Sequence, residues 1–258
     1  MNEREQAALT ALLGSRKYAI LCEDTVRRAF ERALERYGTL KQADKAARAH
    51  LHQIAGAFMD ADTRAAHICL AEYLAGDESA MDRALRLHAS TRERAGARAL
   101  YEAVFRHTGR PDHILDLACG LNPLVLGAMG LDVTGYDIHL GAVQLINEWA
   151  AACAWQVRAE PRDLLGPFEM RRAELALLMK LLPTLEAQRP GCAMALLARV
   201  PARFKLVTFP TRTLGGRRVG MAENYADWFT RHLPEGLRVA ARFVEGDELC
   251  FLTEDAHG

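Results

Sequence analysis

The sequence of 258 residues lacks several features that would point at once to a class of protein. Its six cysteines form no C-x-x-C pair, so neither a disulfide framework nor a zinc cluster is indicated. No run of eighteen apolar residues occurs, and the charged amino-terminal stretch is unlike a secretory signal, so no membrane span or export is expected. Lys plus Arg equals Asp plus Glu, 33 of each, so net charge favours no anionic partner. These absences predict a soluble, cytoplasmic protein.

Metal-ligand patterns are also missing. The nine histidines are scattered, and His50 and His52 are two residues apart, so on a helix they point in different directions. We therefore predict no metal site.

The apolar residues change rhythm once along the chain. Before residue 108 they recur at helical spacing, as in the stripes Val26, Phe30, Ala33 and Ala47, Leu51, Ile54. From Ile114 onward, short apolar runs alternate with helical patterns, which indicates βαβ units and a mainly parallel sheet. The last two runs, 237–244 and 248–253, are close enough to form an antiparallel hairpin at the end of that sheet. The sequence predicts an all-helical domain over 1–108 and an α/β domain over 109–258.

The first strand of the α/β part ends in an unusual way. Its apolar run includes Asp116 and then breaks into Cys-Gly-Leu-Asn-Pro. Gly120 would let a ligand approach the backbone at the carboxyl end of the strand, and Asn122-Pro123 suits the start of a helix. Asp116 could either hold this turn or accept a hydrogen bond from a ligand amine.

Acidic residues end the next two strands as well. Asp137 lies 21 residues beyond Asp116, where a carboxylate can accept hydrogen bonds from two ribose hydroxyls, and Asp163 is placed to meet an adenine amino group. Asp137 alone could be a helix cap, but three acids at successive strand ends favour a nucleotide-type cofactor. The turn has one glycine and no G-K-[ST], which disfavours NAD and ATP. S-adenosylmethionine has no phosphate to bind and is the better fit.

These residues resemble class I methyltransferases in general. In detail the chain is similar to the aminoglycoside-resistance 16S rRNA methyltransferases, which modify N7 of a guanine in the ribosomal decoding site. The likeness spans roughly residues 15–252. It is carried by KY at 17–18, DTVRR at 24–28, LHASTRER at 87–94, LDLACGLNPL at 115–124, GYDIH at 135–139, KLLPTLE at 180–186, FPTRTLGGR at 209–217 and GMAENYADWF at 220–229.

The resemblance implies an α/β, Rossmann-like class I methyltransferase sheet with an all-helical, RNA-docking N-terminal domain. Within it, the guanidinium of Arg94 would bind the methionine carboxylate. Ala118 and Cys119 depart from the glycine-rich form of the first turn and narrow the room there. By resemblance, S-adenosylmethionine contacts Phe58, His88, Ala89, Ser90, Arg94, Ala118, Gly120, Asp137, Asp163, Leu164, Met179 and Gln188.

Local charge is uneven despite the zero total. Residues 190–221 contain six basic residues and no acid. Such a stretch suits an RNA phosphate backbone and predicts salt-sensitive binding. The RNA-binding residues predicted here are Arg199, Arg203, Lys205, Arg212, Arg217 and Arg218.

Methylation of guanine N7 needs placement rather than acid–base chemistry. N7 carries an exposed lone pair, so we name no catalytic acid or base. Lys180 and Pro183 end the fourth strand, near the expected target base, although Lys180 could instead be a snorkelling lysine or part of a structural ion pair. N7 faces the deep major groove of A-form RNA, so the base must be flipped out. The expected substrate is 16S rRNA in the assembled 30S subunit. The protein is expected to act as a monomer.

Two other functions are consistent with the residues alone. A small-molecule methyltransferase could use the helices as a lid, and its turnover would then survive the change of Arg217 and Arg218 to Glu. A non-catalytic RNA-binding protein could carry a vestigial cofactor fold, and it would then bind no S-adenosylmethionine.

Overall fold

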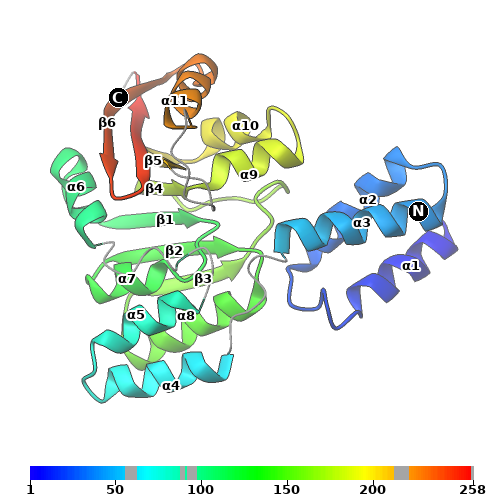
Figure 1. Cartoon of the computed structure of the whole chain (residues 1–258), viewed down its shortest axis with the longest axis horizontal. Helices are drawn as coiled ribbons and strands as arrows, with labels where there is room; N and C mark the ends of the chain where they lie inside the picture. Colours follow the sequence, from blue (N-terminus) through cyan, green and yellow to red (C-terminus); the bar gives the residue numbers. More distant parts are fainter. Residues whose placement is uncertain (56–62, 88–90, 92–97, 212–220, 257–258) are drawn as a thin grey trace.

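The chain folds as a seven-stranded sheet with helices on both faces, joined to a separate group of three helices (Figure 1). The structure is a computed structural model that describes residues 1–55, 63–87, 91, 98–211 and 221–256. The first six helices are α1 (Glu3–Leu13), α2 (Glu23–Arg36), α3 (Leu40–Ala55), α4 (Thr63–Leu74), α5 (Ser79–Arg86) and α6 (Arg98–Thr108).

Strands and helices alternate from β1 onward, as the change of rhythm predicts. The strands are β1 (His113–Leu117), β2 (Asp132–Asp137), β3 (Val157–Pro161), β4 (Ala173–Met179), β5 (Ala202–Pro210), β6 (Leu237–Glu245) and β7 (Glu248–Asp255). The helices of this part are α7 (Pro123–Ala128), α8 (Leu140–Ala152), α9 (Leu181–Gln188), α10 (Cys192–Arg199) and α11 (Met221–His232).

The strand order is β3-β2-β1-β4-β5-β7-β6. The first five strands are parallel, whereas β7 pairs antiparallel with β5 and with β6. The predicted hairpin at the end of the sheet is therefore confirmed, with β7 between β5 and the edge strand β6. The order reverses between β1 and β4, and the crevice beside the carboxyl ends of these strands is where open α/β sheets bind ligands.

The sheet carries a hydrophobic cluster on each face. One face packs against α4–α8, with contacts such as Tyr73 of α4 on Trp149 of α8, whose ring centroids are 5.3 Å apart. The other face packs against α9–α11, where the ring of Phe209 lies over Tyr225 at 4.9 Å. Apolar residues line both faces because parallel strands are buried on both sides.

The helices α1–α3 have a core of their own. It includes Leu12, Phe30 and Leu51, all fully buried. By contrast, α4–α6 contribute residues such as Leu85 and Tyr101 to the cluster on the sheet. The change in packing thus falls between α3 and α4. As a domain boundary, residue 108 stays a prediction, but hydrophobic packing groups α4–α6 with the α/β part.

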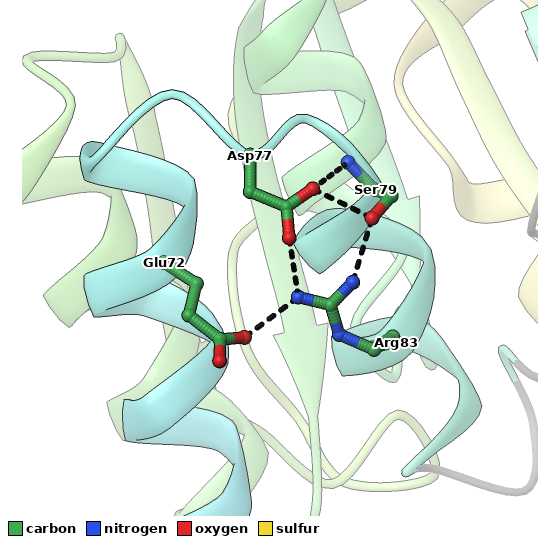
Figure 2. A network of polar contacts seen from close by, with 4 residues as sticks. All are labelled: Glu72, Asp77, Ser79 and Arg83. Atoms are coloured by element: carbon green, nitrogen blue, oxygen red, sulfur yellow. Dashed lines mark hydrogen bonds and ion pairs between the residues drawn. The ribbon is translucent and has the colours of Figure 1, made fainter.

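A polar network fixes the corner between α4 and α5 (Figure 2). Arg83 contacts Glu72 at 2.6 Å and Asp77 at 2.7 Å, and Asp77 accepts hydrogen bonds from the backbone and hydroxyl of Ser79. These hydrogen bonds from Ser79 and Arg83 lower the pKa of Asp77. The network thus holds α5 beside α4, and α4 also packs against α8.

Gly135 on β2 lies directly against the turn that follows β1. A Cβ atom there would sit 2.9 Å from Sγ of Cys119 and 3.1 Å from Cγ of Pro123. Both distances are tighter than ordinary van der Waals contact, so a side chain would push the turn away from the strand. Glycine at this position lets β2 and the first turn approach closely.

Replacing Gly135 by Ala should therefore destabilise the fold by about 1–3 kcal/mol, the usual cost of overpacking a close-packed site. Urea unfolding measures the loss. Gly38→Ala is the matched control, because a Cβ at Gly38 meets nothing within 4 Å. Equal unfolding midpoints for the two variants would show that the turn yields without cost.

Candidate active site

The turn after β1 is held by the carboxylate of Asp137. Ala118 and Gly120 adopt left-handed backbone angles, with φ of 57° and 52°. The Gly120 amide donates a hydrogen bond to Oδ2 of Asp137 at 2.8 Å, and the His139 amide donates to its Oδ1 at 2.9 Å. A non-glycine residue such as Ala118 pays a conformational cost for φ above zero, and such residues cluster at functional sites. One half-buried carboxylate thus ties together the ends of β1 and β2.

A second network, of Asp116, Asn122 and Tyr101, holds the same turn. Nδ2 of Asn122 donates to Oδ2 of Asp116 at 2.6 Å, and the hydroxyl of Tyr101 hydrogen-bonds to Oδ1 of Asn122. Sδ of Met179, at the end of β4, lies 3.8 Å from Nδ2 of Asn122. Asp116 is 1% exposed. Of the two roles considered for Asp116, the structure supports holding the turn.

Asp163, placed after β3, is held by a residue of the N-terminal helices. Nε of Arg28 on α2 donates to Oδ2 of Asp163 at 2.6 Å, while the Leu165 amide donates to Oδ1 at 2.9 Å. The Asp163 side chain is 4% exposed and that of Arg28 is 22% exposed. This is a short charge-assisted hydrogen bond that is largely removed from solvent.

A second arginine of α2 reaches the end of α9. Nη1 of Arg32 donates to the backbone oxygen of Gln188 at 2.6 Å. The last carbonyls of a helix lack partners within the helix, and a cation there is favourable. Oε1 of Gln188 is buried and has no hydrogen-bond partner among the described residues. An acceptor of this kind is available to a ligand amine.

His50 on α3 faces both arginines. Burial is the main cause that lowers its pKa, and the charges of Arg28 and Arg32 lower it further, while Asp163 opposes them. Its buried Nε2 has no hydrogen-bond partner in the described part of the chain. An uncharged His50 adds no further positive charge near Arg28 and Arg32.

The expected cofactor contacts fall into three groups. The first group is the turn after β1, with Ala118 and Gly120 in it and Asp137 holding it. The second is Met179 at the end of β4, close to Asn122. The third comprises Asp163 and Leu164, which follow β3, and Gln188, which ends α9. Each Asp137 oxygen keeps a lone pair for a ribose hydroxyl, and Oε1 of Gln188 is an unused acceptor, so these residues fit an adenosyl ligand. Leu164 is buried next to Asp163. The contacts Phe58, His88, Ala89, Ser90 and Arg94 lie outside the described residues.

Lys180 has the third left-handed non-glycine backbone of the described chain, with φ of 54°. Its amide donates to the oxygen of Thr208 at 3.1 Å, and its Nζ lies 3.6 Å from Oε1 of the buried Glu248 on β7. The structural ion pair considered for Lys180 is therefore present. Pro183 is half-buried in the first turn of α9, where its missing N–H costs little.

The predicted RNA-binding residues are divided by the structure. Lys205 is 2% exposed, and its Nζ binds the Ala202 oxygen at 2.9 Å and Asp255 at 3.1 Å. A phosphate cannot reach an ammonium buried in the sheet, so the prediction for Lys205 is wrong. The sequence does not reveal the burial of Lys205, because its counter-ion Asp255 lies 50 residues further along the chain.

The other described basic residues of that stretch are more exposed than Lys205. Arg199 donates to the Leu164 oxygen at 2.6 Å and lies over the ring of Phe168, so part of its guanidinium is used within the chain. Arg203 is exposed, beside Phe204. Arg212, Arg217 and Arg218 lie outside the described residues.

Sequence reasoning counted Arg28 and Arg32 only as basic residues suited to RNA and did not predict their contacts within the chain. It also missed the hydrogen bonds of Tyr101 and of the Asn122 side chain. Arg28 lies in the motif DTVRR, which marks it but does not name its partner 135 residues away. Tyr101 is fully buried on α6, where helical spacing predicts a core residue and not a hydrogen bond to the turn. Long-range polar pairs of this kind have no periodic signal in a sequence.

Comparisons with known proteins point in one direction. A family model described as ribosomal RNA methyltransferase (FmrO) matches residues 14–240. A 16S rRNA (guanine(1405)-N(7))-methyltransferase of Serratia marcescens is 42% identical over 247 residues, which is 95% of this chain and 96% of that protein. A protein of Micromonospora echinospora with the same name is 35% identical over 95% of this chain and 94% of its own length.

Solved structures agree with the sequence relatives. The 16S rRNA methyltransferase RmtF, in complex with S-adenosyl-L-homocysteine, superposes with a TM-score of 0.89 at 53% identity and covers 99% of this chain and 100% of its own. The 16S rRNA methylase RmtB gives a TM-score of 0.85 at 36% identity over 99% and 100%. The likeness therefore includes α1–α3 as well as the sheet.

Replacing His50 by Gln should flatten the pH dependence of stability on the acid side. The pKa of His50 lies below its ordinary value of 6.5 in the folded chain, so below that pH the unfolded chain binds more protons than the folded one. The wild-type chain then loses stability as the pH falls from 6.5 through the lower, folded-state pKa. The variant lacks that loss.

Thermal melting between about pH 8 and about pH 5, a range that spans histidine titration, measures the difference. His139, whose pKa burial also lowers, contributes equally to both proteins and cancels in the comparison. Parallel curves for wild type and His50→Gln would contradict the assignment.

Proposed function

This chain belongs to the ribosomal RNA methyltransferase (FmrO) family, and we propose that it transfers a methyl group from S-adenosylmethionine to N7 of a guanine in 16S rRNA. The observation that carries the proposal is the match along nearly the whole chain to relatives named for that reaction. The target is the guanine those relatives modify, 1405 in their names, in the decoding A-site. A methyl group and a positive charge at that site would weaken aminoglycoside binding and so confer resistance.

The residues of the first turn supply the cofactor's binding contacts. Asp137 accepts hydrogen bonds from ribose hydroxyls while its hold on the Gly120 amide keeps the turn open to the ligand. Gln188 and Asp163 offer acceptors to an adenine amine. When bound, S-adenosylmethionine supplies an activated methyl group on a sulfonium.

The chemistry assigned to the protein is placement. N7 of guanine has no proton to lose, so a bond from N7 to carbon forms as the carbon–sulfur bond breaks, and the positive charge passes from sulfur to the purine. No general base is needed. Lys180 and Pro183 border the place where β4 ends, beside the turn, and there the chain would meet the flipped base and align it.

The helices α1–α3 are suited to RNA. Residues 1–55 contain ten Lys or Arg and seven Asp or Glu, so this unit is basic although the whole chain is neutral. Several of these cations are exposed, namely Arg16, Lys17, Arg36, Lys41 and Lys45. Contacts from this surface to phosphates would supply the few kcal/mol that flipping the base costs.

The expected substrate form is the assembled 30S subunit. Folded RNA there holds its phosphates at fixed positions, which a rigid basic surface such as α1–α3 can match. The enzyme would act there as a monomer in the cytoplasm. No helix of the described residues is long and apolar enough to cross a membrane.

Incubation of the chain with purified 30S subunits and tritiated S-adenosylmethionine should label 16S rRNA at one guanine, which cleavage at N7-methylguanine locates. Asp137→Asn should lower the rate about ten- to a hundred-fold, the effect of losing a charged hydrogen-bond partner. Asp112→Asn is the matched control, because Asp112 is exposed before β1, away from the turn.

The outcome separates this function from its alternatives. Binding of S-adenosylmethionine without label in 16S rRNA would favour a small-molecule methyltransferase. RNA binding without any binding of S-adenosylmethionine would favour a non-catalytic protein.

A further inference from the structure

Three contacts among the described residues join the N-terminal helices to the cofactor side of the α/β part, and each adjoins a proposed cofactor contact. Arg28 binds Asp163, and Arg32 binds the backbone of Gln188. The third contact is a short bridge beside Asp137. In Figure 1, α1–α3 lie beyond the ends of β1 and β2, which is the side on which these contacts form.

The bridge joins residues 20–22 to residues 138–140. The Cys22 amide donates to the Ile138 oxygen at 2.7 Å, and the Leu140 amide donates to the Ile20 oxygen at 2.8 Å. Ile138 also packs against the core of α1–α3. The segment that follows Asp137 is thus shared by the two hydrophobic units.

The contacts of α2 fix the position of the Asp163 side chain and of the Gln188 backbone. With Arg28 on one oxygen and the Leu165 amide on the other, the carboxylate of Asp163 has a single orientation. Arg32, one turn further along α2, holds the end of α9 where Gln188 turns its unused Oε1 inward. If α2 moved away, the Asp163 carboxylate would lose one of its two donors, and the end of α9 that carries Gln188 would lose its contact with Arg32.

We propose that Arg28 and Arg32 are positioning residues for cofactor binding, through which docking of α1–α3 and binding of S-adenosylmethionine are coupled. The inference rests on the proposed function, since it assigns Asp163 and Gln188 to the adenosyl ligand. Coupling of this kind is reciprocal: if docked helices strengthen cofactor binding, bound cofactor must strengthen docking by the same factor. The RNA-facing unit would then be set in place when the methyl donor is bound.

The first test is calorimetric titration of the whole chain with S-adenosyl-L-homocysteine. Arg28→Ala should weaken binding about 5- to 150-fold, the usual range for coupled sites, and Arg32→Ala should weaken it less. Arg27→Ala is the matched control, because it removes the same charge from the same helix and loses an exposed pair with Glu23 at 2.7 Å. Arg28→Lys should recover part of the affinity, since it keeps the charge but not the planar guanidinium.

Equal affinity of Arg28→Ala and Arg27→Ala, in folded protein, would overturn the inference and leave the proposed function standing. If Arg28→Ala does not fold, Arg32→Ala decides, because it leaves the Arg28–Asp163 pair intact. Absence of binding to the wild-type chain would overturn the proposed function and the inference with it.

The second test addresses the reciprocal effect, which a purely structural role would not produce. Hydrogen exchange of the α2 and α3 amides should slow when S-adenosyl-L-homocysteine is added to the wild-type chain, and slow less in Arg28→Ala. Exchange that does not respond to the ligand in the wild-type chain would contradict coupling.

Discussion

The hydrogen bond from the Gly120 amide to the Asp137 carboxylate is the constraint on which the rest of the site depends. It joins the ends of two neighbouring parallel strands and holds a turn whose backbone is left-handed at Ala118 and Gly120. Gly135 makes that arrangement possible by leaving room for Cys119, and Asn122 and Asp116 support it from the strand side. The shape of the turn is therefore set before any ligand arrives, which lowers the ordering cost of binding.

The second theme is that the site is built from both hydrophobic units. The α/β part supplies Asp137, Asp163 and Gln188, and α2 supplies the arginines that bind the Asp163 carboxylate and the Gln188 backbone oxygen. A buried ion pair is weak evidence for stability, because desolvation offsets much of the attraction, but it does specify geometry. Burial, together with the charges of Arg28 and Arg32, lowers the pKa of His50, so this seam contains a titratable group. In a protein that binds a small cofactor and a large RNA, such a seam can couple cofactor binding to the position of the RNA-binding helices.

Much of this was predictable from the sequence because it follows from local rules. Alternating strand and helix patterns, the glycine and proline of the first turn, and acids at strand ends all have short-range causes. What could not be predicted depends on contacts across the fold. The place of α4 follows from its packing against Trp149 of α8, and the burial of Lys205 follows from a counter-ion on β7. Arg28 and Asp163 are 135 residues apart, and no spacing rule joins them.

The most direct measurement is a crystal structure of the full chain with S-adenosyl-L-homocysteine. The account predicts ribose hydroxyls within hydrogen-bond distance of the Asp137 carboxylate, with the Gly120 amide still bound to it and the Arg28–Asp163 pair in place beside the adenine. A ligand whose ribose lies away from Asp137, or a complex in which α2 has left Asp163, would contradict it.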